Sequence, residues 1–346
     1  MTTIHATPGA LSDDPASGIR PFDIGRDLRP VAELIAEAFA SELDPRGNAA
    51  LREMRVMSHM GGFLKLLNRT TGDFNDVFNG FVWVEDGRVV GNVTVQRADR
   101  YASRWQIANV AVAPAYRGRG IARRLMDRAI GYIQEGGGRW AVLQVYAANR
   151  AARTLYDKMN FEYVGGHADL RLESVPSHRV LATMDEDVPN FYTFGAGHWQ
   201  ELYELANHQL SAQAQWWRGV RRNDYQITLE QQVGEWFAQA LGRRRVYRGC
   251  IQVSRRFEAA IVLTAQRWAG EHQVRLWARP ENFGQFEAPL LRWALVTLDE
   301  YPRFPVTLEL NTEHTQAMDA AQALGFQVTR TLLTMRKPVQ PQAITG

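Results

Sequence analysis

The chain has 346 residues, of which 45% are hydrophobic and 22% are charged, and its formal net charge is +3. This length suits two domains better than one, and the apolar content is sufficient for packed cores. The sequence has no apolar run of the roughly 18 residues that suggest a membrane helix, and no signal-peptide pattern, so a cytoplasmic protein without a membrane partner is expected. The arginines are dispersed and the charge is nearly balanced, which gives no argument for nucleic-acid binding.

The chain contains a single cysteine, Cys250. One cysteine excludes an intrachain disulfide and a cysteine metal cluster, and no metal is expected. Cys250 lies in the strand-like run 247–253, where a small buried apolar residue is a commoner role than a nucleophile. The densest basic run, residues 243–245, is interpreted as the solvated start of a strand.

The first segments in chain order predict one strand, then two helices, then two strands. Residues 1–17 are polar and are expected to be disordered. The dipeptide Asp86-Gly87 separates two runs in which apolar and polar residues alternate, and it is typical of a hairpin turn. The elements predicted before residue 100 are a strand at 19–22, an amphipathic helix with Val31, Leu34, Ile35, Ala38 and Phe39 on one face, a helix at 52–67, and strands at 81–85 and 89–96.

The most informative segment is residues 110–125, where an apolar run ends at Pro114 and a helix follows. The first amides of a helix have no intrahelical acceptor and carry partial positive charge, so they can hold an anion. Gly118 and Gly120 have no Cβ, which allows a phosphate oxygen to approach these amides. Additional positive charge comes from Arg117, Arg119, Arg123 and Arg124. The segment therefore predicts a phosphate-binding loop.

Other interpretations of these glycines are possible. A dinucleotide-binding fingerprint requires a third glycine at position 123, which is Arg123. A Walker-type loop requires Gly-Lys-Ser/Thr, which is absent. A purely structural strand-to-helix turn with surface arginines remains the alternative for this segment taken alone.

A second segment, residues 143–161, predicts a short strand followed by a helix that begins near Asn149. The two segments together resemble the GNAT superfamily of acyl-CoA-dependent N-acetyltransferases. The pyrophosphate signature of that family falls on Arg117, Gly120 and Ala122, and its second signature falls on Asn149, Ala152, Leu155-Tyr156 and Phe161. Asn160 stands where the family usually has glycine, and asparagine tolerates the left-handed conformation.

The resemblance implies an α/β fold of the α+β type, in which a mixed, mostly antiparallel sheet is flanked by helices. It also implies that the strands near Val112 and 143–146 separate and hold the pantetheine arm of acetyl-CoA between them. In such a site Tyr156 lies near the thioester sulfur as the general acid. The residues implied to bind acetyl-CoA are Val110 and Val112 through the main chain, Arg117, Gly118, Arg119, Gly120, Ile121 and Ala122 around the pyrophosphate, and Asn149 and Ala152.

An amine acceptor must lose a proton before it attacks, so a base or a water relay is expected. Gln106 and Asn109 occupy strand positions that supply a base in some relatives, and neither can take a proton. The candidates for the base or for acceptor contacts are Glu42 and Asp44, with Asp73 and Asp76 as further possibilities. Each of these acids has a structural alternative as a solvated loop residue or a helix cap.

The C-terminal half repeats both segments. Residues 308–326 align on 143–161 at a separation of 165, and residues 274–291 align on the loop segment at 166. Phe283 and Phe286 replace Arg117 and Gly120, and the tyrosine position holds Ala321. Glu281 and Glu287 add negative charge that opposes a phosphate. The second copy is therefore predicted to be a degenerate GNAT fold without the cofactor, with a structural role or a role in forming the acceptor site.

This repeat predicts two tandem GNAT-like domains. The remaining elements predicted are the last strands of the first domain at 164–173, helices at 198–210 and 228–241, and strands at 246–253, 259–266 and 330–336. The domain ranges predicted are a disordered start at 1–17, an acetyltransferase domain at 18–175, a linker at 176–189, a degenerate domain at 190–338 and a tail at 339–346.

The function expected from this resemblance is transfer of an acetyl group from acetyl-CoA to a primary amine of a small molecule or peptide. The sequence does not identify the acceptor, and a monomer or a homodimer is equally compatible with it. The alternatives are a non-catalytic CoA-binding or scaffolding protein, which needs no general acid, and a nucleotide sensor.

Overall fold

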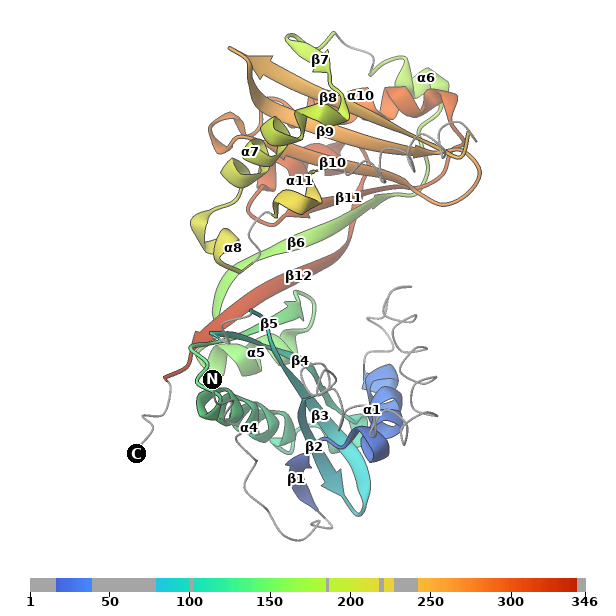
Figure 1. Ribbon diagram of the computed structural model, residues 1–346. Helices are drawn as coiled ribbons and strands as arrows, with labels where there is room; N and C mark the ends of the chain where they lie inside the picture. Colours follow the sequence, from blue (N-terminus) through green and yellow to red (C-terminus); the bar gives the residue numbers. More distant parts are fainter. Residues whose placement is uncertain are drawn as a thin grey trace. The chain divides into compact units, whose positions relative to one another are not determined.

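The computed structural model describes residues 17–38, 79–99, 103–184, 187–217, 221–226 and 242–340. These residues belong to two compact units (Figure 1). The first unit comprises residues 1–144, 157–161 and 336–346, and the second comprises 145–156 and 162–335. None of the described helices is both long and apolar enough to cross a membrane. The predictions for residues 1–16, 52–67 and 228–241 lie outside the described residues.

The boundaries of the two compact units differ from the domain boundaries that the internal sequence repeat predicts. Strand β6 (Glu162–Leu172) was expected to end the first domain, and it groups with the second unit. The expected linker contains the short helix α6 (His178–Leu181), whose Leu181 is buried in the core of the second unit. The repeat-based ranges remain a prediction of where each copy begins and ends.

The sheet of the first unit is mostly antiparallel. β1 to β4 pair in sequence order as antiparallel neighbours, and β4 pairs with β5 in parallel. Asp86 and Gly87 both have positive φ, at 48° and 74°, so the predicted hairpin turn between β2 and β3 is confirmed. The bounds are β1 (Gly18–Pro21), β2 (Gly80–Glu85), β3 (Arg88–Arg97), β4 (Arg104–Val112) and β5 (Trp140–Tyr146).

Two helices cover opposite faces of this sheet (Figure 1). The predicted apolar face of α1 (Ile24–Ala38) packs through Val31 and Ile35 against Val82 and Val84 of β2. On the other face, α4 (Ile121–Glu135) lies so close to β3 that a Cβ on Gly91 would come within 3.0 Å of Ile121 and Leu125 side-chain atoms. The first copy is thus a sheet between helices.

The second unit has the strand order β12-β6-β11-β10-β9-β8-β7. β10 and β11 are parallel, whereas the pairs β6–β11, β9–β10, β8–β9 and β7–β8 are antiparallel. Residues 164–173 were expected to supply more than one strand, but residues 164–172 belong to the single strand β6. The other bounds are β7 (Phe191–Thr193), β8 (Arg244–Val253), β9 (Arg256–Gln266), β10 (His272–Ala278), β11 (Val306–Asn311) and β12 (Gln327–Pro338).

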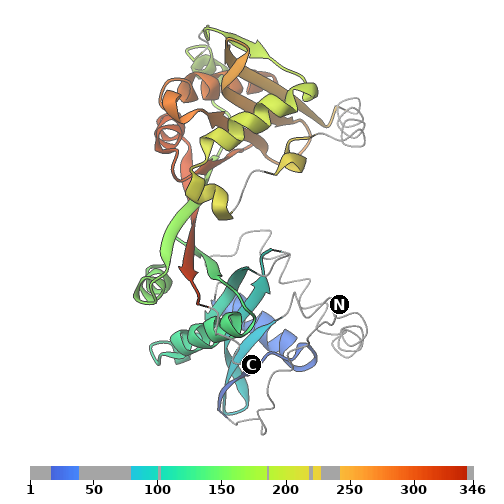
Figure 2. The same cartoon turned by 60° about the vertical axis from the view of Figure 1, so that its left-hand side comes forward.

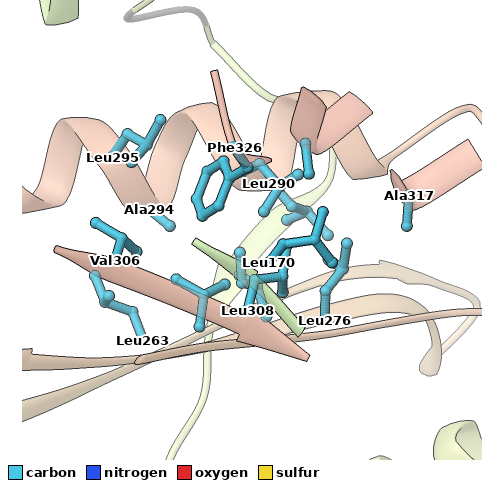
Figure 3. Close-up of a cluster of buried hydrophobic side chains, with 14 of the residues drawn as sticks. Leu170, Leu263, Leu276, Leu290, Ala294, Leu295, Val306, Leu308, Ala317 and Phe326 are labelled. Carbon is cyan, nitrogen blue, oxygen red and sulfur yellow. The ribbon is translucent and has the colours of Figure 1, made fainter. Parts of the chain in front are cut away.

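Helices cover both faces of this sheet as well (Figure 2). Helix α7 (Trp199–Gln209) packs on a cluster that includes Cys250, Ala260 and Val262. Helices α10 (Glu287–Thr297) and α11 (Thr315–Ala323) pack on the larger cluster of the opposite face, part of which is shown in Figure 3. Cys250 is 1% exposed, and burial raises its pKa to about 11, so its predicted role as a buried apolar residue is confirmed.

The internal repeat extends to the local backbone conformation. Short 3-10 turns stand at Pro114–Tyr116 and Pro280–Asn282, and the helices that follow begin at residues 121 and 287, so both pairs are separated by 166. The later helices begin at 150 and 315, a separation of 165. Gly118 and Gly284 are both left-handed, and so are Asn160 and Gly325. These equivalences confirm that the two aligned segments form the same structure twice.

Candidate active site

The parallel strands β4 and β5 are paired over only part of their length. The pairing runs from Arg104 opposite Trp140 to Ile107 opposite Leu143, and both strands continue past it, to Val112 and Tyr146. On its other edge, β4 shifts register against β3 between Asn92 and Thr94. Asn109 has a φ of 51° at this shift, so β4 carries a β-bulge.

The bulge is held by side chains of β3. The Nδ2 atom of Asn92 donates to the main-chain oxygen of Asn109 at 2.9 Å, and Nδ2 of Asn109 lies 3.3 Å from Oγ1 of Thr94. Asn92 is 2% exposed. Sequence reasoning missed Asn92, although an asparagine inside an otherwise apolar run was a usable signal for a buried polar contact.

The predicted phosphate loop follows β4 directly. Gly118 and Gly120 have φ values of 79° and 76°, and a Cβ at either position would meet nothing within 4 Å. Gly120 is the N-cap of α4, and its carbonyl accepts the amide of Arg124. The preceding amides of the first turn have no intrahelical acceptor, and the side of the loop on which the glycine Cβ atoms are missing is open. This geometry suits an anion.

The arginines of the loop also brace the turn itself. Arg117 donates through Nε to the carbonyl of Val112 at 3.1 Å, and Arg119 donates to the carbonyl of Ala115 at 3.3 Å. Arg124 stacks 5.3 Å from the ring centre of Trp83, and Arg123 lies 3.8 Å from the carboxylate of Asp127. The contacts of Arg117 and Arg119 are to main-chain oxygens directly before the loop, so these two residues place positive charge beside the helix N-terminus.

The second signature forms helix α5 (Arg150–Lys158), most of which belongs to the second compact unit. The Oδ1 atom of Asn149 accepts the amide of Ala152 at 3.1 Å, which is a helix N-cap. Tyr156 is 5% exposed and is the buried side chain of this helix. Asn160 has a φ of 60°, which confirms that asparagine takes the left-handed conformation where the family has glycine.

The predicted bases Glu42, Asp44, Asp73 and Asp76 all lie outside the described residues. Asp99, an acid of the first unit, is unsuited to the role. Burial raises the pKa of its carboxyl, but hydrogen bonds from Arg104 and Ser103 lower it to about 2. Within the described ranges, no cluster of three or more His, Cys, Asp or Glu side chains is arranged to hold a metal ion.

The equivalent loop of the second copy contains its own anion. Both carboxylate oxygens of Glu287 accept the amide of Gly284, at 3.0 and 2.9 Å, and one of them accepts the amide of Phe286 at 3.1 Å. Glu287 is 1% exposed. Burial raises the pKa of this carboxyl, but hydrogen bonds from His314 and Gly284 outweigh burial and lower it.

Three further side chains surround this buried carboxylate. His314 lies with Nε2 at 2.6 Å from Glu287, and its Nδ1 faces Nε2 of Gln209 at 3.1 Å. The ring of Phe283 stacks on that of His314 with centroids 3.9 Å apart. Glu287 was singled out from the sequence, whereas His314 and Gln209 were not.

Strand β10 also pairs with β9 without a register shift, so the bulge of β4 has no counterpart in the second copy.

The first copy therefore has an open loop at a helix N-terminus beside two parallel strands that are paired over only part of their length, an arrangement that can hold an anionic ligand. Residues 48–161 match the family model described as Acetyltransferase (GNAT) family. The chain contains a GNAT acetyltransferase domain, as its sequence motifs predicted.

Two curated relatives are similar to short parts of the chain. One is the N-alpha-acetyltransferase MAK3 of Arabidopsis thaliana, which is 35% identical over 82 residues, 23% of this chain and 43% of that protein. The other is the N-alpha-acetyltransferase RimI of Mycobacterium tuberculosis, which is 34% identical over 80 residues, 23% of this chain and 49% of that protein. The chain thus spans less than half the length of each.

Solved structures similar over nearly the whole chain include a GCN5-related N-acetyltransferase from Sphaerobacter thermophilus. It has a TM-score of 0.54 at 15% identity, with 94% of this chain and 97% of that chain covered. At this identity the likeness concerns the fold. The predicted fold class, a mixed sheet flanked by helices and related to GNAT proteins, is confirmed.

Proposed function

We propose that the chain is an acetyl-CoA-dependent N-acetyltransferase that acts on a primary amine of a small molecule or peptide. The observation that carries this proposal is the loop at Gly118 and Gly120, which is open, left-handed and placed at the start of α4 after a bulged strand. Amides 118–122 would bind the pyrophosphate, with charge from Arg117 and Arg119. The names of the two curated relatives support an α-amine as the first acceptor to test.

The reaction is direct attack on the thioester. The neutral amine nitrogen forms a bond to the acetyl carbonyl carbon, the carbon–sulfur bond breaks, and the hydroxyl of Tyr156 gives its proton to the departing thiolate. At pH 7 deprotonation costs about 4 kcal/mol for an alkylammonium of pKa near 10 and about 1.4 kcal/mol for an α-ammonium of pKa near 8. The amine proton passes to a base or to water, for which Glu42 and Asp44 remain the candidates. Main-chain groups of Val110 and Val112 would bind the pantetheine arm, and the resemblance implies further contacts to acetyl-CoA from Asn149 and Ala152.

The second copy is proposed to have no acetyl-CoA site. The amides of Gly284 and Phe286 already hold the carboxylate of Glu287, so a diphosphate would have to displace a buried group of the same charge. Phe286 also stands where the first copy has the glycine N-cap.

Turnover of acetyl-CoA across a panel of amines, with release of free thiol as the readout, tests this function. The panel should contain peptide α-amines, polyamines, aminoglycosides and amino-acid derivatives. Cys250 is the single cysteine and is buried with a pKa of about 11, so the native protein adds little background to a thiol reagent. A protein that binds acetyl-CoA without turning it over on any amine would instead be the CoA-binding module of the alternative hypothesis.

Replacing Tyr156 with phenylalanine is expected to lower kcat by about 100-fold, because the general acid is lost. The KM for acetyl-CoA should change little, since the buried ring is kept. Tyr192→Phe is the matched control, because Tyr192 is 52% exposed on strand β7. Equal kcat values for the two variants would argue against Tyr156 as the acid.

A further inference from the structure

The bulge of β4 places an asparagine in the left-handed main-chain region, which asparagine tolerates but does not prefer. Asn109 is left-handed, with a φ of 51°, and lies opposite the register shift in β3. Asparagine enters this region more readily than most residues but has no strong preference for it. Something outside β4 must therefore select this conformation.

Two β3 side chains contact Asn109, and the more buried contact comes from Asn92, whereas the 3.3 Å contact of the Asn109 side chain with Thr94 is exposed. The Asn92 side chain is 2% exposed, and its Nδ2 donates to the carbonyl of Asn109 at 2.9 Å. Asn92 stands directly opposite Val82 of β2, whose side chain packs with α1, so Asn92 shares the α1 face of the sheet. If β4 had no bulge, the Asn109 carbonyl would turn away from Asn92. The buried side-chain amide of Asn92 would then lose this acceptor, and an unsatisfied buried donor destabilises the fold.

This contact also fixes the direction of the next amide. In a planar trans peptide the carbonyl and the N–H point in opposite directions. Because the Asn109 carbonyl points to Asn92, the N–H of Val110 points away from it. Val110 lies beyond Ile107, where the pairing of β4 with β5 ends.

We propose that Asn92 is a positioning residue for acetyl transfer, which acts by locking the Asn109–Val110 peptide so that the Val110 amide faces the acyl group. This inference rests on the proposed function. An amide aimed at a thioester carbonyl stabilises the negative charge that develops during attack, so its orientation affects kcat more than acetyl-CoA binding.

The test replaces Asn92 with leucine, which keeps the size of the side chain and removes its donor. Steady-state kinetics should show a fall in kcat of about tenfold or more, with the KM for acetyl-CoA within about twofold. Val82→Ala is the control, because it opens a cavity on the same face without touching the bulge, and it should keep the native kcat.

A second variant separates positioning from general loss of structure. Glycine enters the left-handed region freely, so Asn109→Gly in the Asn92→Leu background should restore part of the lost kcat. A crystal structure of Asn92→Leu should show β4 with an altered 109–110 peptide.

The outcomes are distinguishable. A native protein that neither binds nor turns over acetyl-CoA would overturn the proposed function, and the positioning role with it. An active native protein whose Asn92→Leu variant keeps its kcat, or whose Val82→Ala variant loses as much, would overturn the role of Asn92 alone. A retained bulge in the structure of Asn92→Leu would also overturn it.

Discussion

Replacing Glu287 with alanine is expected to lower the free energy of unfolding of the second unit by about 3–5 kcal/mol. The carboxylate accepts hydrogen bonds from the amides of Gly284 and Phe286 and from His314, and all of its oxygens are buried. Alanine leaves these donors without an acceptor in a site closed to water. Each buried donor left in this way costs about 1–3 kcal/mol. Urea unfolding of the full chain, followed by circular dichroism, measures the loss.

The same loop offers a matched control in Glu281. Its side chain is 56% exposed and its ion pair with Arg256 spans 3.4 Å, so Glu281→Ala should change stability by less than about 0.5 kcal/mol. If Glu281→Ala and Glu287→Ala lowered the urea midpoint equally, the carboxylate of Glu287 would not be the group that stabilises this loop.

The stabilisation by Glu287 has a defined pH dependence. Its pKa in the folded chain is lowered from the ordinary value of 4.5, so the carboxylate stabilises the fold above that pH. This contribution is lost as the pH falls through the lower folded-state pKa. The stability difference between the native chain and Glu287→Gln should therefore narrow below about pH 4.5, the ordinary value.

The largest effect on ligand binding is expected at Gly120. Gly120→Asp should weaken acetyl-CoA binding by about 100-fold or more, because a carboxylate at the helix N-terminus opposes the diphosphate. Two like charges about 4 Å apart near a protein surface repel by about 4 kcal/mol, more than the 2.7 kcal/mol that a 100-fold change requires. Calorimetric titration of acetyl-CoA into the full chain measures the affinity.

Two variants separate charge from backbone strain. Gly120→Asn carries a side chain of similar shape without the charge, and asparagine tolerates the left-handed φ of 76°. Its affinity should lie between those of the native chain and Gly120→Asp. Gly137 is also left-handed with open surroundings, but it follows the C-terminal end of α4. Gly137→Asp therefore adds the same charge away from the loop, and this variant should bind acetyl-CoA with the native affinity. Equal loss in Gly137→Asp would argue against a diphosphate at Gly120.

The hairpin and the loop illustrate what is encoded locally. Asp86-Gly87, Gly118, Gly120 and Asn160 are all left-handed, and each was assigned a special turn or loop from its residue type. Such conformations are set by sterics within one residue, so the printed sequence is enough to find them. The repeat was visible for the same reason, since Gly284 and Gly325 occupy the matching positions.

The contacts that hold each copy together were beyond sequence reasoning. Asn92 and Asn109 are 17 residues apart, and Gln209 meets His314 across 105 residues. Which side chains meet across such separations depends on strand register and helix packing, where a shift of one residue turns every side chain to the other face.

The sequence by itself therefore predicted the GNAT domain, the loop at Gly118 and Gly120, and the loss of that loop's charge pattern in the second copy. Only the tertiary structure decided that β4 is bulged and held by Asn92, and that Glu287 fills the second loop as a buried anion. The physical reason is that glycine conformation and charge are properties of single residues and their neighbours. Burial, and the donors that a buried carboxylate or amide must find, exist only after distant segments have packed.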